Sequence, residues 1–456
     1  MSTSTDAPRT HVAGDAAALD RGVRRALVAA GVLVALAVLV PAVTTWDVLA
    51  TDRWPRTVAP LHATWHPTVG IGTPLAVLVA LLGVRYADRV TAGLSWPRLL
   101  LATYAGTVAW TASLALVYGP AGFSRELDST QEYLVTARSV HDVPAFLHGF
   151  VARIPFSAAP DNWPIHVAGH PPGATLFFVA LVRLGLGSSL AAGLMVTAVG
   201  AGVPLAVLVT LRRLGAEDAA RRALPYLVLA PAAIWVAVSG DAVFAAVTAW
   251  ALACVAVAAT TPSRWARLVA AAGAGLLLGL LPLLSYGLVL AGVLVLAVLS
   301  LTRGWRLVPL LALTSLLPTL VAAAYGFSLW SAYPVLRQRY WDGLATERPT
   351  AYWLWASLAS LVISAGPALA AGLGATRAAR RTTDRVVLRL VGAAAAAIAV
   401  ADLSLMSKAE VERIWLPFVP WLLLSTAALP PRWRRPVLLL QVATALVVQT
   451  LLDTTW

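Results

Sequence analysis

The sequence predicts an all-α polytopic membrane protein. Hydrophobic residues make up 59% of the 456-residue chain, and charged residues only 12%. Long apolar runs recur along the chain and are separated by short loops that carry arginines, a pattern typical of successive membrane-spanning helices. The formal net charge is +13. Because the arginines are dispersed between the apolar runs and form no single basic face, we interpret them as orientation signals and exclude nucleic acid as a partner.

The N-terminal part is predicted to consist of a polar cytoplasmic tail, residues 1–25, and three transmembrane helices within residues 26–118. The three apolar runs cover residues 26–43, 68–84 and 99–118. Arg21, Arg24 and Arg25 precede the first run, and no convincing small-residue cleavage site accompanies it. We therefore expect this span to be retained and not removed as a signal peptide.

Residues 119–187 are predicted to form a large outer loop that contains juxtamembrane helices. Its apolar segment 172–186 begins at Pro172, which suits the first turn of a helix, and ends near Arg183. About 15 residues are too few for a full crossing. If this segment does not cross, the inner loops and the tail hold about two thirds of the 34 basic residues, as the positive-inside rule requires. We therefore place the segment on the outer surface.

Residues 188–456 are predicted to form a region of about ten transmembrane helices, which gives about 13 in the whole chain. The apolar runs are 188–211, 223–238, 242–260, 268–284, 287–301, 307–325, 351–373, 386–405, 414–429 and 436–452. Two outer loops interrupt this region, residues 330–350 and residues 407–413. The second loop holds Lys408, the only lysine in the chain. With residues 119–187, these loops are the outer segments that are long or polar enough to build a site.

The first of these outer segments contains an acidic motif, Glu126-Leu127-Asp128, ahead of an apolar pattern that predicts a helix over residues 130–138. Asp128 lies close enough to cap this helix, and a capping carboxylate is one interpretation. The other interpretation is chemical, because an outer site with both carboxylates and cations can bind a lipid phosphate while it deprotonates a hydroxyl. The two interpretations are compatible with each other.

Several motifs follow this acidic motif in a characteristic order. They are Tyr133 with Ala137 and Arg138, then His170-Pro171-Pro172, then Arg212-Arg213, then Ser239-Gly240-Asp241. In order and sidedness they resemble the GT-C superfamily of integral membrane glycosyltransferases, which includes protein O-mannosyltransferases and the lipid A aminoarabinose transferase. The likeness covers residues 126–286. The chain departs from the family in placing the acidic motif after the third span, and in having Glu-Leu-Asp where the family has an adjacent acidic pair.

The resemblance implies transfer of a sugar from a polyprenyl-phosphate donor to a glycan, lipid or protein hydroxyl, with inversion, on the outer face of the bacterial cytoplasmic membrane. It implies that Asp128 is the general base, with Glu126 as the other candidate. Lys408 and Arg413 are the first candidates to hold the donor phosphate, with Arg337 and Arg339 behind them. His170 is a further candidate to bind the phosphate or the sugar, since the amides of a helix N-terminus favour an anion, and its other interpretation is simple interfacial capping.

Five further residues are candidates to bind the substrate or line the same cavity. They are Glu410, Glu412, Asp241, Tyr286 and His166. Glu410 and Glu412 have a second interpretation, in which they only hold the hairpin in shape as salt partners of its cations. A divalent metal is compatible with this chemistry, but no residue cluster indicates one, and the single Cys254 provides no thiolate site.

Other classes of membrane protein remain open at this point. A secondary transporter or lipid flippase would have as many spans, but the sequence has neither internal repeats nor paired broken helices, and its polar residues gather at one surface. A lipid-to-polymer ligase would share the basic outer loops without needing the acidic motif. A structural scaffold gives no reason for outer loops rich in tryptophan and proline.

Overall fold

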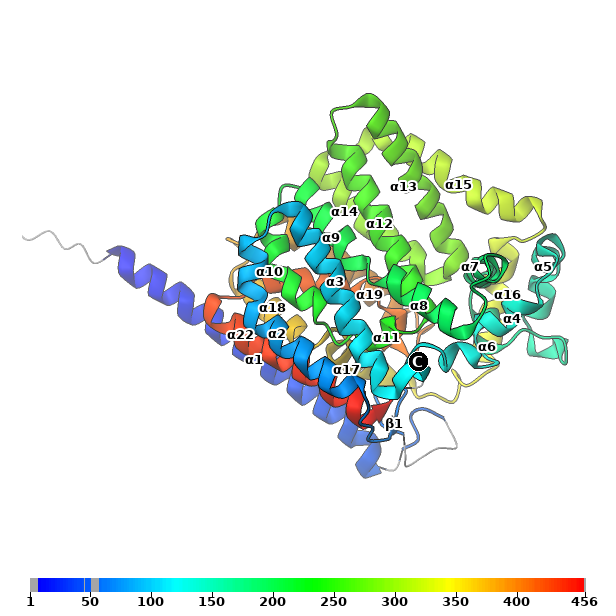
Figure 1. The fold of residues 1–456 in the computed structure, drawn as a ribbon, viewed down its shortest axis with the longest axis horizontal. Helices are drawn as coiled ribbons and strands as arrows, with labels where there is room; N and C mark the ends of the chain where they lie inside the picture. The colour runs from blue at the N-terminus through cyan, green and yellow to red at the C-terminus, as the bar shows by residue number, and fades with distance from the viewer. Residues whose placement is uncertain (1–6, 45, 51–56, 455–456) are drawn as a thin grey trace, which may run out of the picture.

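The computed structural model describes residues 7–44, 46–50 and 57–454 (Figure 1). These residues are almost entirely helical, and their one sheet is a two-stranded antiparallel pair, β1 (Thr64–Trp65) with β2 (Leu452–Asp453). The predicted all-α class is therefore confirmed.

The N-terminal helices are longer than predicted. They are α1 (Ala7–Thr44), α2 (Gly72–Gly93), α3 (Trp96–Ala115) and the 3₁₀ helix η1 (Leu116–Phe123). Residues 7–25, predicted as a polar tail, belong to α1, because their many alanines favour a helix that continues into the apolar run. Residues 1–6 of the predicted tail lie outside the described residues.

The loop of residues 119–187 folds into short helices that gather with α16 at one end of the molecule (Figure 1). They are η2 (Glu126–Asp128), α4 (Tyr133–Ser139), α5 (Val143–Gly149), η3 (Val151–Arg153), η4 (Phe156–Ala158), α6 (Ile165–Gly169) and α7 (Pro172–Arg183). Helix α7 has 12 residues with Pro172 in its first turn. It is too short to cross a bilayer, as predicted for residues 172–186.

The remaining helices follow in chain order. The first group is α8 (Ser189–Gly200), α9 (Val203–Arg213), α10 (Glu217–Val228), α11 (Ala233–Val236), α12 (Gly240–Thr260), α13 (Arg264–Leu284), η5 (Tyr286–Leu290) and α14 (Ala291–Thr302). The second is η6 (Trp305–Leu307), α15 (Val308–Ala324), α16 (Leu329–Trp341), α17 (Thr350–Ala365) and α18 (Pro367–Ala378). The third is α19 (Arg385–Leu403), α20 (Val411–Ile414), α21 (Val419–Leu423), η7 (Leu424–Ala428) and α22 (Pro431–Leu451).

The described residues contain seven helices that are long and apolar enough to cross a membrane, or eight if α17 and α18, which meet at 102°, form one span. The count of about 13 is not confirmed. Prolines are one reason, since Pro417 interrupts the apolar run 414–429 between α20 and α21, and Pro420 lies in the first turn of α21. Charges are another, since α2 carries Arg85, Asp88 and Arg89 inside its 22 residues.

Close helix packing and one buried arginine fix the arrangement of the bundle. Helices α13 and α15 run side by side (Figure 1), and a Cβ on Gly279 would lie 2.1 Å from the Ser315 carbonyl oxygen, so only glycine permits this approach. On the side predicted to be cytoplasmic, Arg221 Nη1 donates to the carbonyl oxygens of Thr91 (2.7 Å) and Leu94 (3.2 Å). Two loops that the sequence analysis assigned to the same side are therefore in contact.

Candidate functional site

A cavity of about 1700 Å³ lies where the predicted outer segments meet. Its wall is built mainly from residues 126–170 of the large loop, from residues 329–348, and from residues 400–418. Tyr286 and its neighbours also line it, as do residues 49, 57, 62–64, 316 and 319. The three segments that the sequence analysis selected thus converge on one space, although more than 200 residues separate the first from the last. One part of the wall is charged and another is apolar.

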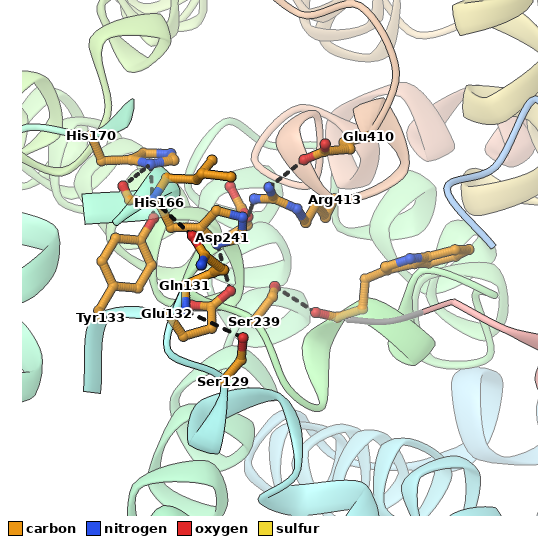
Figure 2. A network of polar contacts seen from close by, with 12 residues as sticks. Ser129, Gln131, Glu132, Tyr133, His166, His170, Ser239, Asp241, Glu410 and Arg413 are labelled. Atoms are coloured by element: carbon orange, nitrogen blue, oxygen red, sulfur yellow. Dashed lines mark hydrogen bonds and ion pairs between the residues drawn. The ribbon is translucent and has the colours of Figure 1, made fainter. Parts of the chain in front are cut away.

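The charged part contains a carboxylate–imidazole pair that was not predicted. Glu132 precedes α4, and its Oε1 lies 2.5 Å from His166 Nδ1 in α6 (Figure 2). Gln131 joins the two segments, since its backbone oxygen accepts from His166 N (3.3 Å) and its side-chain oxygen from Ile165 N (3.2 Å). Both side chains of the pair are about nine-tenths buried. Burial alone would raise the pKa of Glu132, but the neighbouring His166 holds this pKa below its usual range.

Beside this pair, a tyrosine hydroxyl contacts a second imidazole. The Tyr133 hydroxyl is 2.8 Å from His170 Nδ1, which is also 3.1 Å from the His166 carbonyl oxygen. The Tyr133 ring stacks on Phe178 of α7, so the loop is packed onto the helix behind it. Burial lowers the pKa of His170 to about 4, although the negative charge of Asp241 acts to raise it. His170 therefore lines the cavity as a neutral side chain near pH 7 and not as the cation that a phosphate ligand would favour.

Arg413 lies between two carboxylates (Figure 2). Its Nη1 is 2.7 Å from Asp241 Oδ2, in the first turn of α12, and its Nη2 is 2.7 Å from Glu410 Oε2. Burial alone would raise the pKa of Glu410, but Arg413 holds it well below its usual range. Arg348 lies 3.6 Å from the other oxygen of Glu410. Arg413 was predicted to hold the donor phosphate, but its positive charge is balanced within the protein.

Lys408 and Arg339 differ from Arg413, because neutral carbonyls hold them. Lys408 Nζ donates to the backbone oxygens of Ala345 and Arg348, both at 3.0 Å, and lies over the Trp341 ring. Arg339 donates to the carbonyl oxygens of Ile154 and Trp163. The two residues line the cavity at 5% and 7% exposure, and neither has an ion pair with a carboxylate in the described part of the chain. The wall therefore carries positive charge that no carboxylate contact offsets.

Asp128, the predicted base, lies away from this space. Its side chain is 56% exposed, accepts a hydrogen bond from Ser189 Oγ and lies 3.9 Å from Arg138. It is not among the described residues that line the cavity. The capping interpretation is wrong, because α4 begins at Tyr133, and Asp128 ends the 3₁₀ turn η2 four residues before the N-cap position.

The other predicted site residues are divided between the cavity and its surroundings. Glu126 lines the cavity and pairs with Arg125 at 3.0 Å. Tyr286 also lines it, with its ring 5.6 Å from that of Tyr333. Glu412 is fully buried behind the wall, where its Oε1 accepts from the backbone N of His62 at 3.1 Å. Arg337 is exposed on α16 and is not one of the described lining residues.

The sequence analysis missed Glu132 and Arg348. Glu132 stands beside the motif tyrosine, and that adjacency was the available signal. Arg348 precedes a proline in a predicted loop, and nothing in the sequence linked it to Glu410, 62 residues on. No group of three or more His, Cys, Asp or Glu side chains that could hold a metal ion occurs among the described residues. Comparison of the chain with family models, with curated proteins and with solved structures finds no match.

Proposed function

We propose that the protein is a membrane glycosyltransferase that moves a sugar from a polyprenyl-phosphate donor to an acceptor hydroxyl at the outer face of the bacterial cytoplasmic membrane. The observation that carries this proposal is a single cavity in which buried cations without carboxylate partners meet an apolar wall. GT-C membership, a cytoplasmic N-terminus and the larger number of spans belong to the same proposal. The order of the sequence motifs supports the first, the distribution of arginines the second, and the number of apolar runs the third.

The two carbonyl-bound cations favour an anionic ligand. A buried charge is costly unless an opposite charge or several hydrogen bonds compensate it. Within the described part of the chain, Lys408 and Arg339 donate hydrogen bonds only to carbonyl oxygens, and each keeps N–H donors beyond these bonds. A phosphate group would supply the missing negative charge through charge-assisted hydrogen bonds. The structure thus supports two of the four predicted cations as phosphate ligands, while Arg413 serves to hold Asp241 and Glu410.

The apolar wall favours a lipid tail on that phosphate. It is formed by residues of η5, α15 and α16, among them Leu288, Val289, Leu290, Leu316, Leu329 and Trp330. Several of them, such as Val289 at 61% and Trp330 at 91%, are exposed at the protein surface. An isoprenoid chain can bury apolar area against this wall while its phosphate lies at the cations. A free sugar nucleotide would have no use for such a surface.

The experiment compares ligands that differ in one feature. We expect the unfolding temperature of the purified protein in detergent to rise with undecaprenyl phosphate and to change little with undecaprenol, which has the same chain without the charge. Phosphatidylglycerol serves as a second anionic lipid. Release of undecaprenyl phosphate is then measured from a panel of undecaprenyl-phosphate sugars with membrane extracts as the acceptor source.

The outcomes separate the alternatives. Stabilisation by undecaprenyl phosphate together with its release from a sugar-bearing donor would support transfer. Binding without release, combined with movement of a fluorescent polyprenyl phosphate across proteoliposomes, would identify a flippase instead. Equal stabilisation by phosphatidylglycerol and undecaprenyl phosphate, with no release, would contradict the proposal.

A further inference from the structure

We propose that Glu132 is the general base of this transfer and that His166 is its positioning residue. The inference rests on the proposed function and names the group that accepts the proton of the acceptor hydroxyl. Three observations carry it: the position of Glu132 in the cavity wall, the state of its two carboxylate oxygens, and the different surroundings of Asp128.

The two oxygens of Glu132 have different partners. Oε1 contacts His166 Nδ1, whereas Oε2 is buried and has no hydrogen-bond partner within the described part of the chain. A buried carboxylate oxygen without a donor has given up its bound water without gaining a hydrogen bond, which is unfavourable. Since Glu132 lines the cavity, a hydroxyl of a bound acceptor can supply the missing donor. Glu132 therefore has one oxygen that is anchored and one that lacks a hydrogen-bond donor among the described residues.

His166 fixes the carboxylate and keeps it ionised. The backbone of His166 is itself held, because its N–H donates to the backbone oxygen of Gln131, in the segment that carries Glu132. The carboxylate–imidazole contact thus links two adjacent backbone segments and limits the rotation of the Glu132 side chain. The low pKa of Glu132 follows from the same contact, so the base is deprotonated over the physiological pH range.

Asp128 lacks both properties. One of its oxygens accepts from the Ser189 hydroxyl, at the start of α8, and its side chain lies at the exposed side of the loop beside Arg138. Its contacts tie η2 to α8. Glu126 lines the cavity, but it pairs with Arg125, which also binds Asp453. Of the three carboxylates in this segment, Glu132 alone combines a buried place in the wall with an oxygen that lacks a donor among the described residues.

The proposed step is balanced within the site. The acceptor oxygen attacks the anomeric carbon of the sugar and forms the new C–O bond while its proton passes to Glu132. The bond between the anomeric carbon and the phosphate oxygen breaks, and its electron pair leaves with the polyprenyl phosphate at the cations. Glu132 is then a neutral acid and releases its proton to water. No oxidant or reductant is consumed.

Glu132→Gln tests the base directly. The amide keeps the size of the side chain and its contact with His166 but cannot take the proton. We expect transfer to fall a hundredfold to ten-thousandfold, with stabilisation by undecaprenyl phosphate retained. Asp161→Asn, a matched change at an exposed carboxylate of the same loop, should leave transfer within about twofold. A second variant, Glu132→Ala, removes the carboxylate altogether. It should regain activity when formate, a small external carboxylate, is added.

His166→Gln tests the positioning role. Without the imidazole, burial raises the pKa of Glu132, so the acidic limb of the kcat/KM profile should move to higher pH. A merely structural histidine would lower the amount of folded enzyme and leave the limb in place. An unmoved limb in a folded His166→Gln enzyme would contradict the positioning role.

The results that overturn the inference differ from those that overturn the function. If wild-type enzyme transfers sugar and Glu132→Gln does so at a similar rate, Glu132 is not the base. If Asp128→Asn loses transfer while Glu132→Gln keeps it, the base is Asp128. If wild-type enzyme neither binds undecaprenyl phosphate nor releases it from any donor, the proposed function fails and the base assignment fails with it.

Discussion

Replacing Arg413 with methionine is expected to destabilise the fold strongly before it affects any reaction. The guanidinium lies 2.7 Å from Asp241 and 2.7 Å from Glu410, and it connects α20 to the first turn of α12. Methionine has a similar length and keeps the packing of the side-chain stem, but it leaves both carboxylates without this partner. The expected loss of stability therefore comes from the unpaired charges and not from an empty space left in the packing.

The two carboxylates should not contribute equally to this loss. Asp241 is 6% exposed and has no second cation within ion-pair distance among the described residues, whereas Glu410 is 20% exposed and keeps Arg348 at 3.6 Å. Breaking a buried ion pair by removing one partner costs about 3–5 kcal/mol. We assign most of this cost to Asp241. Because folded proteins are stable by only about 5–15 kcal/mol, such a loss is a large fraction of the total.

The assay is the half-life of the monomeric peak in size-exclusion chromatography at raised temperature, since membrane proteins often unfold irreversibly. Arg413→Met should shorten it many-fold. Adding Asp241→Asn should restore most of the half-life, because the buried charge is then removed, and adding Glu410→Gln should restore less. An Arg413→Met protein as durable as the wild type, or a better rescue by Glu410→Gln, would refute the reasoning.

Three further predictions concern charge, pH and topology. Lys408→Met should lower the apparent affinity for undecaprenyl phosphate at least tenfold, and Lys408→Arg should retain most of this affinity. A thermal-shift assay at increasing ligand concentrations would measure both. Burial raises the pKa of Glu412 from 4.5 to about 7, so the stability it contributes is present at low pH and lost as pH rises through 7. The pKa of His170 is lowered from 6.5 to about 4, so the stability that His170 contributes is present above pH 6.5 and is lost as pH falls through 4. Glu412→Gln should therefore make stability rise more steeply with pH between 4.5 and 6.5 than it does in the wild type, as chemical denaturation would measure; a pH dependence identical to that of the wild type would contradict the raised pKa of Glu412. Finally, an impermeant thiol reagent applied from outside should label Gly187→Cys and miss Ala216→Cys, and labelling of position 216 would contradict the proposed topology.

The arrangement of the outer segments followed from hydropathy and charge, but the direction of individual side chains did not. Short α7 was predictable because Pro172 and Arg183 limit its apolar length. The choice between Asp128 and Glu132 was not, since the 3₁₀ turn η2 and the extended residues after it decide which carboxylate faces inward. A helix drawn through residues 130–138 would include Glu132, whereas Glu132 precedes α4 in an extended conformation.

Long-range pairing was equally hidden from the sequence. Arg413 looked like a phosphate ligand because its neighbours along the chain were known, while its partner Asp241 lies 172 residues earlier. The number of spans was overestimated for a related reason. Hydropathy counts an apolar run whether it forms one straight helix or, as after Pro417, several short helices buried in the bundle.

The contact between Arg125 and Asp453 joins residues that are 328 positions apart in the sequence, and β1 pairs with β2 across an even longer stretch of the chain. Arg125 also holds Glu126 at the cavity wall. During synthesis on the ribosome, most of the bundle can enter the membrane while this corner of the cavity still lacks its partner. The contact between Arg125 and Asp453 therefore forms only after translation has passed residue 453. A chain terminated after residue 418 would carry all the described lining residues and still lack Asp453 beside Arg125.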